Sequence, residues 1–107
     1  MTLEEYIERI KSEMGDEEEN IKVYASGNSV VIETVITDEE LKEMNEDAGY
    51  ELSRDEISEE LDAALSMTED VYKELLKEAK KEVPEIESFT IRFVDEKGGV
   101  FVSRTFK

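Results

Sequence analysis

The sequence predicts an α+β fold: a two-layer sandwich in which a four-stranded antiparallel sheet carries helices on one face, formed by a single domain over residues 1–107. Two segments alternate apolar and polar residues around a glycine-containing turn, as β-hairpins do. Two other segments repeat apolar residues at helical spacing. With 107 residues the chain has room for one modest core. The predicted order is helix, strand, strand, short helix, helix, strand, strand.

The first predicted element is an amphipathic helix. Its apolar residues recur at helical spacing: Leu3, Tyr6, Ile7, Ile10 and Met14. Thr2 and Glu5 have the spacing of a capping box, which satisfies backbone amides at the start of a helix. Gly15 ends the helix, and an acidic connector follows at residues 16–20.

A β-hairpin is predicted next, with strands at residues 21–26 and 29–37 joined by the two-residue turn Gly27-Asn28. This loop length places Lys22 opposite Glu33, so that opposite charges pair across the strands. The face of the second strand that this register assigns to the core consists of Val30, Ile32 and Ile36.

The middle of the chain is predicted to be helical in two parts. Thr37 or Asp38 caps a short helix, which ends at Gly49. A longer apolar pattern at helical spacing then runs through residues 54–83 and stops before Pro84, which cannot continue a helix.

The long helical pattern exceeds the length of the predicted strands. Unbroken, residues 54–83 would span about 45 Å, roughly twice the length of a seven-residue strand. The helix is therefore expected to overhang the sheet or to bend. Ser66 and Glu69 repeat the capping-box spacing, which favours a kink or break near Ser66 and Met67 over a continuous helix.

The chain closes with a second hairpin whose register the sequence leaves open. An aromatic strand beginning near Phe89 precedes a turn at residues 97–99. A two-residue turn would place on the face of Phe89 the residues Val102, Arg104 and Phe106. A three-residue loop with Gly98 left-handed would instead place there Phe101, Ser103 and Thr105.

Acidic residues dominate the composition, with 30 acids, 13 bases and a formal charge of −17. Residues 1–62 carry 21 acids and 5 bases, whereas residues 63–107 carry 9 acids and 8 bases. This charge opposes binding to nucleic acid and to anionic lipid. No stretch has the apolar length of a membrane span and the N-terminus does not resemble a signal peptide, so we expect a soluble chain, cytoplasmic if expressed as written.

The sequence offers no motif for catalysis or for cofactor binding. Cysteine, histidine, tryptophan and glutamine are absent, which excludes disulfides, histidine-based catalysis and the usual zinc ligand sets. The carboxylates lie in runs or on polar helix faces rather than as a buried pair. We therefore expect no enzymatic activity and no cofactor.

Two short segments have the composition of ligand-binding loops. An EF-hand loop starting at Asn45 would place Gly49 fifth and Tyr50 at the sixth position, where glycine is required, so the calcium motif fails. The sequence DEKGG at residues 95–99 joins two strands, so we interpret it as a hairpin turn rather than a phosphate-binding loop. No specific metal site is expected.

One apolar cluster remains once the core face is assigned. The predicted registers place on the second face of the sheet Tyr24, Val31, Val35 and, from the third strand, Val94. A two-layer domain leaves that face to water, so the cluster is either an interaction patch or ordinary strand-forming composition. As a patch it would bind an unidentified partner protein or a second copy, in a monomer or a weak homodimer.

Several stretches together resemble a known family. They are TLEEYIE, IKVYASGNSVVIET, LDAALSMTEDVYKELLKEAKKEV and FTIRFVDEKGGVFVSRTFK. The resemblance covers nearly the whole chain, and the final hairpin is its most specific part. The family comprises small extracytoplasmic domains of unknown function from lipoproteins and secreted proteins of Gram-positive bacteria. It implies a fold and a cellular setting, and neither a mechanism nor site residues.

The same residues also fit an engineered or generated relative of that family. The absent residue types, the repeated capping boxes and the consistent hairpin register are typical of designed sequences. The function we expect is that of a stable, non-enzymatic α+β domain with no assigned activity. The alternative is a protein-binding or self-associating module that uses the exposed sheet face or the acidic N-terminal half.

Overall fold

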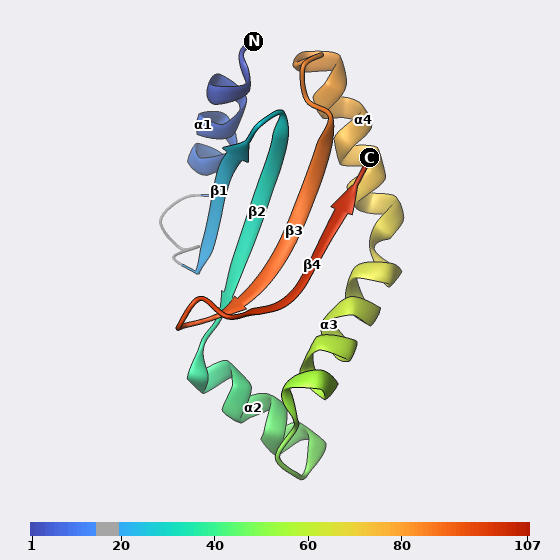
Figure 1. The fold of residues 1–107 in the computed structure, drawn as a ribbon. Coiled ribbons are helices and arrows are strands. Elements are labelled where there is room, and N and C mark those ends of the chain that lie inside the picture. The colour runs from blue at the N-terminus through green and yellow to red at the C-terminus, as the bar shows by residue number, and fades with distance from the viewer. Residues whose placement is uncertain (15–19) are drawn as a thin grey trace.

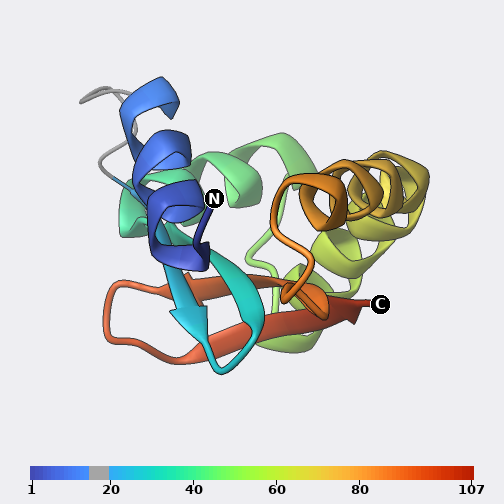
Figure 2. The same cartoon turned by 90° about the horizontal axis from the view of Figure 1, so that it is seen from above.

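The computed structural model describes residues 1–14 and 20–107, which form four helices and four strands (Figure 1). In chain order these are α1 (Leu3–Met14), β1 (Ile21–Ser26), β2 (Ser29–Ile36), α2 (Asp38–Ala48), α3 (Arg54–Met67), α4 (Glu69–Glu82), β3 (Ser88–Asp95) and β4 (Val100–Phe106). The acidic connector predicted at residues 16–20 lies, except for Asn20, outside the described residues. The α+β class is confirmed, and α1 and α4 lie on one face of the sheet (Figure 2).

The sheet is mixed, so the prediction of a purely antiparallel sheet is wrong. The strands lie in the order β1-β2-β3-β4, with antiparallel pairing inside each hairpin and parallel pairing between β2 and β3. Parallel neighbours require a long crossover, because the chain must return to the end at which the first strand began. The three helices α2, α3 and α4 form that crossover (Figure 1). Local patterns identify each hairpin, but they do not specify how two hairpins join.

The predicted order of elements is also wrong, because the long helical segment forms two helices. The break lies at Thr68, close to the predicted position. The predicted capping box does not form there, since no side-chain hydrogen bond caps α4. Ser66 Oγ instead accepts a hydrogen bond from Arg104 of β4 (2.7 Å), and Thr68 Oγ1 donates to the Ala64 carbonyl oxygen (3.0 Å). The observed order is α-β-β-α-α-α-β-β.

Three other predicted helix ends are confirmed, whereas the end predicted at Gly15 lies outside the described residues. The Glu5 amide donates to Thr2 Oγ1 (3.2 Å) and the Thr2 amide donates to Glu5 Oε1 (3.3 Å), which completes the capping box of α1. Of the two candidate caps for α2, Thr37 accepts the hydrogen bond, from the Glu40 amide (3.1 Å). Gly49 ends α2 in the left-handed conformation, with φ 80°.

The first hairpin has the predicted register. Lys22 pairs with Glu33 and Tyr24 pairs with Val31 across the two-residue turn. The apolar residues Val30 and Ile36 of β2 are buried on the side of the helices, as expected for the core face.

The last hairpin combines features of both predicted alternatives. Gly98 is left-handed (φ 88°) and the Asp95 amide donates to the Gly99 carbonyl oxygen (2.9 Å), as in the longer loop. The pairing then shifts after Phe93, which leaves Phe101 as the extra residue of a β-bulge. Because of the bulge, β4 presents to the face of Phe89 the residues expected for the short turn. The residues opposite Phe93, Ile91 and Phe89 are Val102, Arg104 and Phe106.

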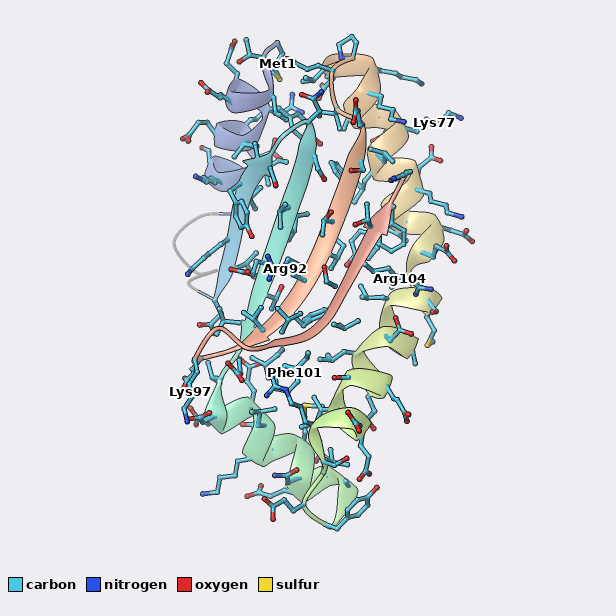
Figure 3. All side chains as sticks on the ribbon, in the orientation of Figure 1. Met1, Lys77, Arg92, Lys97, Phe101 and Arg104 are labelled. Atoms are coloured by element: carbon cyan, nitrogen blue, oxygen red, sulfur yellow. The ribbon has the colours of Figure 1, made fainter. Side chains whose placement is uncertain are left out.

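The hydrophobic core is divided along the length of a molecule that measures 47 × 27 × 20 Å. The larger cluster packs α1 and α4 onto the sheet and contains ten residues that are at most 9% exposed. A smaller cluster around Ile36, Ile57 and Phe101 lies where the sheet meets α2 and α3 (Figure 3). A third, around Leu65 and Phe106, joins α3 to the sheet. We call residues 38–62 the arm; its helices extend beyond the end of the sheet (Figure 1).

Candidate binding groove between α1 and α4

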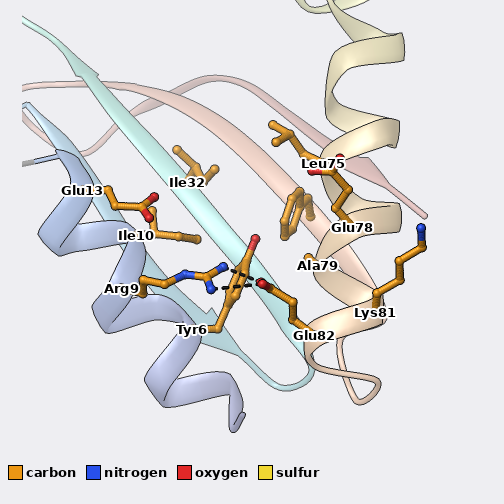
Figure 4. A pocket seen from close by; sticks show the side chains of 11 residues that line it. Tyr6, Arg9, Ile10, Glu13, Ile32, Leu75, Glu78, Ala79, Lys81 and Glu82 are labelled. Atoms are coloured by element: carbon orange, nitrogen blue, oxygen red, sulfur yellow. Dashed lines mark hydrogen bonds and ion pairs between the residues drawn. The ribbon is translucent and has the colours of Figure 1, made fainter.

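A groove runs between α1 and α4 over the middle of the sheet (Figure 4). It arises because α1 packs on β1, whereas α4 packs on β3 and β4. These two helices, each about 10 Å wide, leave part of the sheet between them uncovered. The groove has a volume of about 670 Å³, and the sheet residues that line it are Ile32 and Phe89.

The α1 wall is amphipathic. The residues that line the groove from this helix are Tyr6, Arg9, Ile10 and Glu13. They recur three or four residues apart and therefore share one side of the helix. The neighbouring side of α1 buries Leu3 and Ile7 in the main core, which fixes the rotation of the helix and holds the groove-lining side in place.

The α4 wall leaves apolar surface exposed. Leu76 and Ala79 are buried against the sheet, but Leu75 is 42% exposed where it lines the groove. Val71 lies one turn earlier on α4, is 58% exposed, and borders a second hollow together with Leu75. The apolar surface of α4 therefore continues from the groove toward the start of that helix.

An ion pair bridges the two walls although its residues are 73 positions apart in the chain. The two Nη atoms of Arg9 donate to the two carboxylate oxygens of Glu82, and the Nη1 to Oε1 distance is 3.1 Å. The guanidinium carbon also lies 5.3 Å from the centre of the Tyr6 ring. Arg9 Nε is buried and has no hydrogen-bond acceptor among the described residues. The bridge is bidentate, but one donor of its arginine remains unsatisfied.

The electrostatic environment of the groove is negative. Burial raises the pKa of the Tyr6 hydroxyl; the positive charge of Arg9 opposes this rise, and Glu82, Glu13 and Glu78 add to it. The hydrogen bond from Arg9 lowers the pKa of Glu82, which keeps that carboxyl ionised. Three carboxylates from two helices therefore act on one tyrosine in the groove.

The predicted interaction patch lies on the open face of the sheet, at the register positions expected. Tyr24 pairs with Val31, and Val35 pairs with Val94. Val31 and Val94 are only 5% and 4% exposed, because each lies on a central strand with neighbours on both sides. The patch therefore presents less apolar surface than the sequence suggests, and binding there stays a prediction.

Polar side chains on this open face bond to one another. Arg92 lies at the middle of the sheet (Figure 3), where its Nη1 donates to the Tyr24 hydroxyl (3.4 Å) and lies 3.8 Å from a carboxylate oxygen of Glu33. Ser88 donates to the Ser29 hydroxyl (2.9 Å). A hollow of about 300 Å³ lies over this network. Because these groups already have partners, they attract a ligand less than unpaired groups would.

The candidate calcium loop that begins at Asn45 has a structural role in the arm. Asn45 Oδ1 accepts from the Leu52 amide (2.8 Å), and Glu56 forms a capping box with Ser53 at the start of α3. Glu56 also accepts a hydrogen bond from the Tyr50 hydroxyl (2.8 Å), which lowers the pKa of Glu56 and raises that of Tyr50. Within residues 1–14 and 20–107, no group of three or more potential metal ligands is present.

The sequence interpretation missed the groove. Its walls come from segments far apart in the chain, and the pairing of Arg9 with Glu82 leaves no local pattern. One signal was present: Leu75 and Leu76 are adjacent, so one of them must lie off the buried stripe of the helix. Val71, one turn before Leu75, extends that second apolar stripe.

Comparisons with known proteins identify a family but no activity. No helix within the described residues is long and apolar enough to cross a membrane. Neither a curated protein nor a solved structure matches the chain. A family model described as a domain of unknown function (DUF4854) matches residues 2–106. The chain therefore belongs to this family of domains of unknown function, DUF4854.

Proposed function

We propose that this domain is a non-enzymatic binding module whose partner is a protein segment held in the groove between α1 and α4. The observation that carries the proposal is the apolar wall of the groove, where Leu75 stays 42% exposed beside a hollow of about 670 Å³. Concave sites with apolar linings and a few charged groups are the usual setting for ligand binding. Exposed leucine and valine at successive turns of one helix are also typical of protein-binding surfaces.

The chemistry of the carboxylates supports a non-enzymatic role. General acid catalysis by a carboxyl group requires a raised pKa. The pKa values of Glu56, Glu82 and Asp95 are instead lowered, because each accepts hydrogen bonds that stabilise the charged form. Each of these carboxylates already has a structural partner.

The open sheet face is the second candidate surface. The hollow of about 300 Å³ near Tyr24 and Val31 favours it. Its central valines are buried and its hydroxyl groups are paired, so it offers a partner less apolar area than the groove. The net charge of −17 opposes self-association there and opposes nucleic acid as a partner on either surface.

The cellular setting is part of the proposal. The resemblance of the sequence to domains of lipoproteins and secreted proteins supports an extracytoplasmic role in Gram-positive bacteria. The consistent local signals, such as the two complete capping boxes of α1 and α3, support an engineered or generated relative of such a domain. In either case the binding surface would be the same.

Selection of peptides from a random phage-displayed library on the immobilised domain tests whether the groove is the binding site. Each selected peptide is then measured against L75S and V100S, two substitutions of side chains that are both 42% exposed. Val100 lines the hollow on the open face, so it reports on the competing surface. We expect L75S to weaken binding and V100S to leave it unchanged. A failure to select peptides, or binding that depends on Val100 alone, would contradict the proposal.

A further inference from the structure

We further propose, resting on the groove as the binding site, that its partner is a basic amphipathic helix. The apolar face of that helix packs on Val71 and Leu75 of α4. Its lysine or arginine side chains lie beside carboxylates on both walls of the groove.

The groove is suited to a helix rather than to an extended strand. It is walled by two helices whose interior backbone groups bond within the helix, so it presents side chains and no unpaired backbone edge. An extended segment would leave its own backbone amides unpaired in such a site, whereas a helix satisfies them internally. The side chains of α4 at four-residue intervals form the ridges between which those of a second helix can pack.

The groove-facing side of α4 has the length of a short helix. Val71, Leu75 and Glu82 lie on the side of α4 that faces the groove and its extension, since they line the two adjoining hollows. From Val71 to Glu82 the helix rises roughly 16 Å, which matches about three turns of a partner helix. The Arg9–Glu82 bridge crosses the groove near the C-terminal end of α4, so the part beside Val71 and Leu75 lies outside the bridge.

The charge of the groove selects a basic partner. Glu13 and Glu78 lie on opposite walls (Figure 4), and neither forms an ion pair with any described residue. Lys81 also lines the groove, but in Figure 4 its amino group points away from the other lining side chains. Asp70 and Glu74 flank the exposed valine and leucine farther along α4. An apolar strip bordered by carboxylates complements a helix with an apolar stripe between cationic residues.

Three 18-residue synthetic peptides provide the probe. The first contains only leucine and lysine, arranged so that the leucines form one helical face. The second replaces every lysine by glutamate, and the third scrambles the first so that no apolar face forms. Binding to the intact domain is measured by fluorescence anisotropy of the labelled peptides. We expect the first peptide to bind and the other two to bind at least about tenfold more weakly.

Two matched double variants locate the charge effect. E13Q/E78Q removes one carboxylate from each wall of the groove, and E59Q/E60Q removes two exposed carboxylates from α3 in the arm. Both change the net charge by two. We expect the groove variant to raise the Kd of the leucine-lysine peptide by about tenfold, as the loss of two charge contacts implies, and the arm variant by less than about twofold.

The outcomes separate this inference from the proposed function. If the glutamate peptide binds as tightly as the lysine peptide and L75S weakens both, the groove binds helices but does not select basic ones, and this inference fails alone. If the scrambled peptide binds equally, or if both double variants act equally, attraction to the net charge explains the binding and the inference fails. If L75S changes no binding, the groove is not the site and both proposals fail.

Discussion

The two ends of the molecule are built differently. At one end α1, α4 and the sheet enclose a core of ten buried residues beside the groove. At the other end the arm meets the sheet in a cluster of three buried residues, of which only Ile57 belongs to the arm, and no residue of α2 is buried. The arm, residues 38–62, also carries 12 acids and 2 bases, a charge of −10 out of −17 for the whole chain. The end with the larger core therefore holds the candidate site, and the end with the smaller core holds most of the negative charge.

This difference shows that the strongest negative charge and the candidate binding groove lie in different parts of the molecule. Strong acidity draws attention to the first 62 residues as a binding region, but no residue of the arm lines the groove. A rigid wall is needed to hold a groove open, and burial of Leu76, Ala79 and the adjoining C-cap residue Val83 gives α4 that rigidity. The negative charge of the arm instead raises the long-range attraction of the molecule for cations.

Matched leucine truncations should reveal the largest difference between the two ends. L76A removes a side chain that is 3% exposed in the main core, and we expect it to lower the free energy of unfolding by about 3 kcal/mol. L41A removes a half-buried side chain in the arm, and the expected loss is about 1 kcal/mol because less apolar surface is buried. Urea denaturation followed by circular dichroism measures both. Equal losses would show that the two ends are not distinct in stability.

The attachment of the arm to the sheet should depend on Arg54. Its guanidinium lies 4.2 Å from the centre of the Phe101 ring, and its Nη1 donates to Asp95 Oδ2 (3.0 Å). Gly99 permits this approach, since a Cβ atom there would lie 2.7 Å from Arg54 Nη2. We expect R54M to lower global stability by less than about 1 kcal/mol, because the pair is partly exposed.

Hydrogen exchange gives the regional readout for the same variant. Amides of α2 and the first turns of α3 should exchange faster in R54M, while those of β2 and β3 stay unchanged. G99A, which displaces the same guanidinium, is expected to reproduce the pattern. Faster exchange throughout the sheet would mean that the arm and the main core unfold as one unit.

Acidification should weaken the attachment of the arm to the sheet, because it protonates Asp95. Hydrogen bonds from the Gly99 amide, from Arg54 and from the Lys97 amide lower the pKa of the Asp95 carboxyl in the folded state. The ionised form therefore contributes stability above the ordinary aspartate pKa of about 3.9, and this contribution is lost as the pH falls through the lower folded value. D95N lacks this contribution at any pH.

Melting temperatures from pH 6 down to pH 2.5 measure that contribution. The gap between wild type and D95N should be constant above pH 5 and should close as the pH falls below about 4. A gap that widens on acidification would mean that the pKa of Asp95 is raised on folding rather than lowered.

The dependence of the melting temperature on salt should show the smallest difference between the two ends of the molecule. Raising sodium chloride from 50 to 500 mM screens repulsion among the carboxylates, so we expect the Tm to rise by about 4 °C. The double variant E43Q/E46Q in the arm should reduce this rise more than E74Q/E85Q, since the arm has the higher density of charge. Differential scanning calorimetry gives the values, and a larger effect of E74Q/E85Q would contradict the difference in charge between the two ends.

Local signals in the sequence predict most of the elements. Capping residues such as Thr37, the turn at Gly27, and the pairing of Lys22 with Glu33 depend on near neighbours, and all three are observed. The parallel pairing of β2 with β3 depends on the path of three helices, and local patterns do not contain it. The bulge at Phe101 likewise depends on more than its local sequence, since it combines a left-handed Gly98 with burial of both Phe101 and Phe106.

The candidate site was less predictable than the fold. The observed registers pair Tyr24 with Val31 and Val35 with Val94, but the burial of Val31 and Val94 depends on neighbouring strands that the sequence does not order. The groove depends on the distance between α1 and α4, which follows from packing on different strands of one sheet. Of the features of the groove, only the second apolar stripe of α4, at Val71 and Leu75, is visible as a pattern in the sequence.

The most direct test uses isoleucine methyl groups as reporters of the two ends. Ile10 and Ile32 line the groove, whereas Ile57 is buried in the arm. In methyl NMR spectra of the domain titrated with the leucine-lysine peptide, the signals of Ile10 and Ile32 should shift and saturate while that of Ile57 stays in place. A shift of Ile57 with no change at Ile10 and Ile32 would contradict the assignment of binding to the groove and assign it to the acidic arm.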